Sequence, residues 1–207
     1  MRTREPFGKL ESIALPLARE NVDTDQIVPA RYLQKPYADD FGPYLFRDLR
    51  ADAAGMPRAD FVLNQPAYAG ARVIVARHNF GCGSSREHAV WALYDHGFRA
   101  AIAPSFGDIF YNNALKNGFL PIVLAADVVD ALLLAIQARA GARVAIDLET
   151  QTVRTPDVHV HRFAIDTFAR DCLLAGHDEI DYTLALSGLI TEYESRHGMP
   201  IHHPHPS

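Results

Sequence analysis

The feature that most constrains the fold is an alternation, from about Arg72 onward, of short β-branched apolar runs with stretches of helical periodicity. This alternation is typical of βαβ units, in which helices pack on a mostly parallel sheet. The predicted strands are residues 72–76, 99–103 and 120–124, and the predicted helices are residues 85–96, 105–117 and 127–140. A capping box of Ser105 and Asp108 opens the second helix, which turns Phe106, Ile109 and Phe110 inward.

Beyond residue 142 the pattern changes to alternating polar and apolar residues. Strands are predicted at 143–148, 152–154 and 158–163, so that an antiparallel layer joins the parallel one and two sheets are expected. Helices are predicted at 166–175, ended by Gly176, and at 178–197, where Gly188 weakens the middle. The last ten residues contain three prolines and are expected to form a flexible tail.

Charge and composition exclude several classes of protein. The net charge of −5 disfavours a main role in binding nucleic acid or an anionic membrane. The longest apolar run, 131–136, is far shorter than the roughly 20 residues that span a bilayer. A charged N-terminus without an apolar stretch predicts a cytoplasmic location. The only cysteines, Cys82 and Cys172, are too few to bind an iron–sulfur cluster or form a zinc cage.

Residues 26–65 form a long aromatic region without a clear period. It carries four prolines, and its aromatic side chains include Tyr32, Tyr37, Phe41, Tyr44 and Phe46. Long ordered loops are often functional, but stacked aromatic rings also serve to cover a sheet, and both interpretations remain open.

The most informative stretch for chemistry is Asn79-Phe-Gly-Cys-Gly-Ser-Ser-Arg-Glu-His88. Its two glycines allow a sharp turn after a strand, and Ser84 with Glu87 fits a capping box, which predicts a helix N-terminus that binds an anion. Arg86 falls in the first helical turn, where acidic residues are usual, and a bound carboxylate or phosphate would explain it. A capped helix with a solvated arginine is the alternative.

Several familiar sites do not fit the chain. The turn lacks the third glycine of a dinucleotide fingerprint, and Cys82 occupies the place of the serine in a nucleophile elbow. A structural cysteine is a more common reading of Cys82 than a thiol nucleophile. Asn21-Val-Asp-Thr-Asp-Gln-Ile-Val-Pro29 has alternate acids but lacks the glycine and glutamate of a calcium loop. Asp25 there either orients a hydroxyl or an arginine, or caps a turn. The histidines are scattered, without metal-site spacing.

Both motifs, with Trp91-Ala-Leu93, Ile102-Ala-Pro-Ser-Phe106 and Asp108-Ile-Phe-Tyr111, resemble the swivelling domain of the aconitase superfamily. Within it, the chain is most similar to the small-subunit family of bacterial isopropylmalate dehydratases, over nearly its whole length. The resemblance implies an α/β, three-layer β/β/α fold with a mostly parallel central sheet and an antiparallel second sheet. Its expected parts are a swivelling domain at 1–165, a helical C-terminal extension packed on it at 166–197, and a flexible tail at 198–207.

The resemblance also implies an activity and a partner. In this family a large subunit holds a [4Fe-4S] cluster, and the small subunit closes the active site over a dicarboxylate substrate. The implied reaction is a hydro-lyase reaction that isomerises 2-isopropylmalate and 3-isopropylmalate through isopropylmaleate in leucine biosynthesis. Two alternatives are the small subunit of a homoaconitase or methylmalate dehydratase, and a non-catalytic module that binds anions.

By the same resemblance, Ser84 is the base that removes a proton, with Asp25 in a supporting catalytic role. Ser85 and Arg86 bind the substrate. Arg31, six residues after Asp25, is a further candidate for a substrate carboxylate, although the family pattern does not require an arginine there, and residues 33–46 are the expected wall for the isopropyl group. A helix N-terminus contributes at most about 2 kcal/mol, or roughly 1.5 pKa units, too little to activate a serine hydroxyl. Arg86, a dry closed site and the partner must supply the rest. We therefore expect the chain alone to be inactive.

Overall fold

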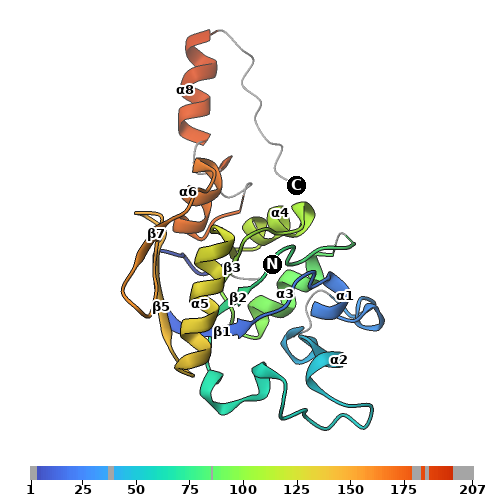
Figure 1. Cartoon of the computed structure of the whole chain (residues 1–207). Helices are drawn as coiled ribbons and strands as arrows, with labels where there is room; N and C mark the ends of the chain where they lie inside the picture. The colour runs from blue at the N-terminus through green and yellow to red at the C-terminus, as the bar shows by residue number, and fades with distance from the viewer. Residues whose placement is uncertain (1–3, 37–39, 85, 179–182, 185–186, 198–207) are drawn as a thin grey trace.

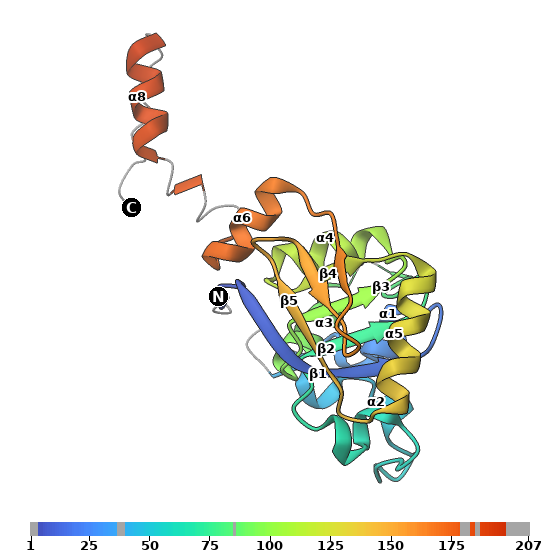
Figure 2. The same ribbon diagram turned by 60° about the vertical axis from the view of Figure 1, so that its left-hand side comes forward.

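The computed structural model describes residues 4–36, 40–84, 86–178, 183–184 and 187–197. Seven strands form one curled sheet in the order β4-β3-β2-β1-β5-β6-β7 (Figures 1 and 2). Strands β1 to β4 pair in parallel, and β5 to β7 continue the sheet in antiparallel pairing from β1. The strands are β1 (Lys9–Leu17), β2 (Val73–Ala76), β3 (Ala100–Ala103), β4 (Leu120–Val123), β5 (Arg143–Asp147), β6 (Thr152–Arg154) and β7 (Val160–Arg162).

Strand β1 corrects the prediction of a separate second sheet. Its first half pairs antiparallel with β5 and its second half, from Ala14, pairs parallel with β2, so β1 joins both parts into one sheet. No second sheet stands apart among the described residues. The strand itself was not predicted. Pro16 argues against a central strand, because proline has no N–H to donate to a neighbouring strand. It lies beyond the part of β1 that pairs with β5, however, so no strand on that side requires a hydrogen bond from its nitrogen.

The helices are α1 (Thr24–Ile27), α2 (Arg47–Arg50), α3 (Glu87–Asp95), α4 (Asp108–Lys116), α5 (Ala126–Ala138), α6 (Thr167–Ala175) and α8 (Ser187–His197). Helices α3 to α6 follow the predicted alternation, with shorter bounds, whereas α1 and α2 were not predicted. Of the helix predicted at 178–197, the structure describes α8 from residue 187 onward. The prediction for α6 is confirmed at both ends. The Asp166 side chain accepts a hydrogen bond from the Ala169 N–H at 3.0 Å, and Gly176 ends the helix in the left-handed conformation. The predicted tail, 198–207, lies outside the described residues.

Helix α4 differs from its prediction. It begins after Gly107, without a side-chain cap, and the Ser105 hydroxyl instead accepts a hydrogen bond from the Asn79 N–H at 2.9 Å. Ile109, predicted to face inward, is 48% exposed, whereas Phe110 is buried. The buried face of α4 consists of Phe110, as predicted, and Ala114, one turn later.

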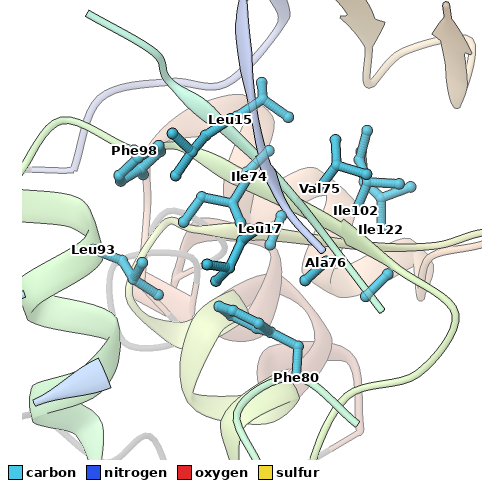
Figure 3. Close-up of a cluster of buried hydrophobic side chains, with 14 of the residues drawn as sticks. Leu15, Leu17, Ile74, Val75, Ala76, Phe80, Leu93, Phe98, Ile102 and Ile122 are labelled. Atoms are coloured by element: carbon cyan, nitrogen blue, oxygen red, sulfur yellow. The ribbon is translucent and has the colours of Figure 1, made fainter. Parts of the chain in front are cut away.

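The core lies on both faces of the parallel strands. Every residue of β2 and β3 is buried, as expected for strands with helices on both sides. In Figure 3, Ile74 points to the side of Leu93 from α3, and Val75 points to the opposite side. Helix α5 packs across β1, β2 and β3 (Figures 1 and 2). The parallel strands are therefore a rigid base for the loops at their ends.

The aromatic region is built from the 3-10 turns η1 (Ala30–Tyr32), η2 (Gly42–Tyr44), η3 (Val62–Asn64) and η4 (Pro66–Tyr68), together with α2. Phe41 and Phe46 are fully buried, and the Phe41 ring meets Trp91 of α3 edge-on at 5.7 Å. Tyr32 and Tyr44 stack with ring centroids 4.2 Å apart. Phe41 thus covers α3 and not a sheet, and the Phe46 ring packs against Phe61 with centroids 5.9 Å apart. Tyr37 lies outside the described residues.

Within the residues that the structure describes, no helix has the length and apolar character needed to cross a membrane.

Candidate active site

The two sequence motifs meet at one edge of the sheet. Parallel strands β1, β2 and β3 are neighbours, and the segments that follow them carry Asp25, Ser84 with Arg86, and Ser105 respectively. The carboxyl ends of adjacent parallel strands meet at the same edge, which is where ligands bind in open α/β sheets. The topology thus brings together residues that are far apart in the sequence.

A ladder of hydrogen bonds joins the segment after β1 to the turn after β2. The N–H of Asn21 donates to the His78 carbonyl at 2.9 Å, and the N–H of Gly81 donates to the Val22 carbonyl at 2.7 Å. A side-chain bond of 2.8 Å from Asn79 to Asn21 lies beside them. These bonds continue the parallel pairing beyond the strands and hold the turn after β2 against the segment that follows β1.

The segment after β3 supports the turn from its other side. Phe80 donates its N–H to the Ser105 carbonyl at 3.1 Å, and Gly107 donates its N–H to the Phe80 carbonyl at 2.9 Å. Gly81 has a φ of +74°, and a Cβ there would overlap the side chain of Phe110. The glycine is therefore required both for the backbone conformation and for the close approach of α4.

The predicted capping box of Ser84 and Glu87 is wrong. Helix α3 begins at Glu87, and its N-cap is Arg86, which is extended (φ −135°) and makes no side-chain capping bond. The cause lies in the turn. The Ser84 carbonyl accepts a hydrogen bond from Thr24 at 3.1 Å, which ties this residue to α1 and leaves the helix to begin later. The expected helix N-terminus is present, but Arg86 occupies its cap.

Arg86 and Asp25 form an ion pair, in which Arg86 Nη1 donates to Asp25 Oδ1. The Arg86 side chain is 17% exposed and the Asp25 side chain 52%. Among the described residues, Asp25 is the one hydrogen-bond partner of this guanidinium, which has five N–H donors. The donors that Asp25 leaves unused suit a second carboxylate.

Ser84 is exposed beside this ion pair. Within the described residues, which exclude Ser85, no side chain hydrogen-bonds the Ser84 hydroxyl. This part of the chain thus presents the hydroxyl without a neighbouring base. A partner surface that closes over the turn would have to complete its environment.

Cys82 is not a candidate nucleophile in this geometry. Burial raises the pKa of its thiol, and the nearby Asp23 carboxylate raises it further. A thiol with a raised pKa is protonated at neutral pH and reacts slowly. This result agrees with the structural interpretation of Cys82.

Arg31 is held elsewhere. Its guanidinium pairs in bidentate fashion with Asp48 and lies 4.7 Å from the Tyr32 ring centroid. The Asp48 hydrogen bond is the largest of the effects that raise the pKa of Arg31. The structure therefore brings together Ser84, Arg86 and Asp25 and not Arg31, while Ser85 and residues 37–39 lie outside the described part of the chain.

Sequence reasoning missed Thr24 and Ser105, which hold the turn in place. Each is a short polar residue next to a motif residue, and neither the local pattern nor the spacing shows that it reaches the turn after β2. The described residues also contain no group of three or more His, Cys, Asp or Glu side chains that would bind a metal ion.

Known proteins resemble this chain over most of its length. Residues 4–127 match the aconitase C-terminal domain family, and residues 130–167 match the LeuD_N family. The chain is 48% identical to a 3-isopropylmalate dehydratase small subunit of Magnetococcus marinus over 93% of this chain and 95% of that one. It is 50% identical to the protein of the same name from Rhodospirillum centenum, with the same coverage.

A solved structure shows the same likeness. The crystal structure of 3-isopropylmalate dehydratase (leuD) from Methanocaldococcus jannaschii matches with a TM-score of 0.63 and 30% identity. The match covers 90% of this chain and 99% of that one.

Proposed function

This chain belongs to the aconitase C-terminal domain family, among its 3-isopropylmalate dehydratase small subunits, and we propose that it supplies the proton-transfer and carboxylate-binding side of that active site. The enzyme is a hydro-lyase of leucine biosynthesis. The observation that supports our assignment is the juxtaposition of an exposed Ser84 with the Arg86–Asp25 ion pair at the carboxyl edge of the sheet.

In the proposed reaction, Arg86 binds a substrate carboxylate through donors that Asp25 does not use. Ser84 Oγ, in its ionised form, takes the proton from the carbon next to that carboxylate. The hydroxyl group leaves the neighbouring carbon as hydroxide on the partner's side of the closed site, so that the proton and the hydroxide together make up the water that is lost. One water is thus lost to give isopropylmaleate. Addition of water in the opposite sense gives the isomer, so there is no net redox change. Ser85 is a supporting donor in this proposal, and Arg31, paired with Asp48, is given no step in it.

The proton step needs a low-dielectric environment. An exposed serine hydroxyl is a weak base, and Arg86 stabilises its ionised form far more effectively once water is excluded. The name small subunit implies a large-subunit partner. We propose that this partner closes over the turn and that the isolated chain is inactive for this reason.

The residues of this chain do not fit an iron–sulfur cluster. Cys82 lies in the turn and Cys172 lies buried in α6, and the described residues offer no third ligand beside either. We propose that the large subunit carries the [4Fe-4S] cluster. Every step assigned to this chain is a hydrogen-bond or proton step that does not pass through the cluster.

A substrate panel tests the choice of acid. The assembled enzyme should turn over isopropylmalate with a kcat/KM at least about tenfold above that for methylmalate, since an isopropyl group buries about two more methyl groups than a methyl group does. The same preference is expected over homocitrate-type acids, which would place a charged carboxylate against an apolar wall. Preference for one of the other acids would identify a related hydro-lyase. Tight dicarboxylate binding by the isolated chain, together with no turnover in the assembly, would identify a module that only binds anions.

A further inference from the structure

Thr24 connects α1 to the turn that carries Ser84. Its side chain is buried, with 2% of the residue exposed. The hydroxyl donates a hydrogen bond to the Ser84 carbonyl at 3.1 Å, and the N–H of Thr24 donates to the Cys82 carbonyl at 2.9 Å. Two consecutive hydrogen bonds from one residue therefore hold the turn on either side of Gly83.

The turn needs such an anchor because its own backbone is permissive. Gly83 is exposed and has a φ of +94°, a conformation that glycine adopts at little cost but does not fix. Ser84 is exposed as well, so packing does not set its orientation. The hydrogen bond from the buried Thr24 hydroxyl to the Ser84 carbonyl is the contact that ties this residue to α1.

The next residue of α1, Asp25, holds Arg86, the proposed ligand of the substrate carboxylate. Asp25 pairs with Arg86, so that two consecutive residues of α1 hold the two consecutive parts of the proposed site. Because the carboxylate of Asp25 is half exposed while Thr24 is buried, the two contacts differ in kind. The ion pair orients a charge, whereas the threonine bond fixes the backbone.

We propose that Thr24 is a positioning residue for the dehydration reaction, whose hydroxyl sets the peptide plane of Ser84 and thereby the direction of Ser84 Oγ. This inference rests on the proposed function of Ser84. Proton transfer depends steeply on geometry, and a misplacement of about 1 Å costs about a hundredfold in rate. Loss of this contact should lower kcat and not raise KM, because Thr24 holds Ser84, the proposed base, and not Arg86, which binds the carboxylate.

The test compares Thr24→Val with Thr24→Ser in the complex of this chain with its large subunit. Valine keeps the shape and removes the donor, while serine keeps the donor. We expect Thr24→Val to lower kcat by about 10- to 100-fold, because the partly buried hydrogen bond to the Ser84 carbonyl is lost, with KM within about threefold of the wild type. Thr24→Ser should retain kcat within about threefold.

Thr155→Val is the matched control. Thr155 is also buried, at 6% exposed, and its hydroxyl donates to Asp157 and to the His159 carbonyl in the β6–β7 turn, away from the site. This variant loses a comparable buried hydroxyl and should leave kcat unchanged. A loss of kcat equal to that of Thr24→Val would reduce Thr24 to a general contribution to stability and overturn the proposal.

Hydrogen exchange gives a readout that does not depend on activity. Peptides that cover residues 81–86 should exchange faster in Thr24→Val than in Thr24→Ser or the wild type. Unchanged exchange in that segment, or an unchanged kcat in Thr24→Val, would overturn the proposal. Inactivity of the wild-type complex on isopropylmalate would instead contradict the proposed function, and the exchange comparison would still decide whether Thr24 holds the turn.

Discussion

Arg86 and Asp25 lie 61 positions apart in the sequence and form an ion pair in the structure. The pair joins the segment after β1 to the start of α3, across the edge where β1 and β2 end. The Arg86 side chain is mostly buried, whereas the Asp25 side chain is half exposed.

Arg86→Lys should raise KM and lower kcat/KM by about 10- to 100-fold. A lysine keeps the charge but loses the planar fork that binds a carboxylate through two parallel bonds, and charged hydrogen bonds contribute about 1.5–3 kcal/mol. Steady-state kinetics of the assembled enzyme measure the effect. Arg143→Lys, in an exposed pair with Glu11 on β1, is the control and should be silent. An unchanged KM in Arg86→Lys would remove Arg86 from substrate binding.

Ser84→Ala should abolish turnover while the two subunits still assemble. The Ser84 side chain is exposed, so its removal leaves the core and the melting temperature unchanged. Size-exclusion chromatography of the mixed subunits checks assembly, and turnover is measured on the same sample. Ser187→Ala, on α8, serves as the control. More than a few per cent of wild-type activity would exclude Ser84 as the base.

Cys82 should alkylate slowly at neutral pH. Burial and the Asp23 carboxylate raise the pKa of its thiol, so its thiolate is scarce at pH 7 and becomes abundant only as the pH rises above the ordinary thiol value. The rate of iodoacetamide modification at Cys82, followed by peptide mass spectrometry, should keep increasing above pH 9. A rate that levels off near pH 7 would mean an activated thiolate and would contradict the structural role.

Gly81→Ala should destabilise the chain by about 3 kcal/mol more than Gly70→Ala. Both glycines have nearly the same φ, +74° and +75°, and so share a backbone cost of about 1–2 kcal/mol. Only Gly81 faces Phe110, while nothing lies within 4 Å of a Cβ at Gly70. Denaturant unfolding of the two variants separates the clash from the φ cost. Equal losses would show that the turn moves away from α4 freely.

The parts of the fold that the sequence predicted are those set by local chemistry. The parallel strands appear as short apolar runs, and α6 has both a capping aspartate at 166 and a terminal glycine at 176. Both signals lie within a few residues of the structure that they specify. Local patterns of this kind survive folding because the tertiary environment agrees with them.

The parts that were missed depend on distant contacts. β1 was overlooked since it is half antiparallel and half parallel, and neither half shows one clean period. The predicted start of α3 was too early, because the Ser84 carbonyl accepts a hydrogen bond from Thr24, 60 residues upstream. Of the site, the motifs supplied Ser84, Arg86 and Asp25, but only the sheet order shows that Asp25 meets Arg86.

The most direct test of the account is anaerobic dehydration of isopropylmalate, followed through formation of the unsaturated product. It is measured for this chain alone, for the large subunit with an intact cluster alone, and for their mixture. We expect activity only in the mixture, because we propose that the proton-transfer and carboxylate-binding groups reside on this chain and that the closed site needs both subunits. Full activity of the large subunit alone, or none in the mixture, would contradict this proposal.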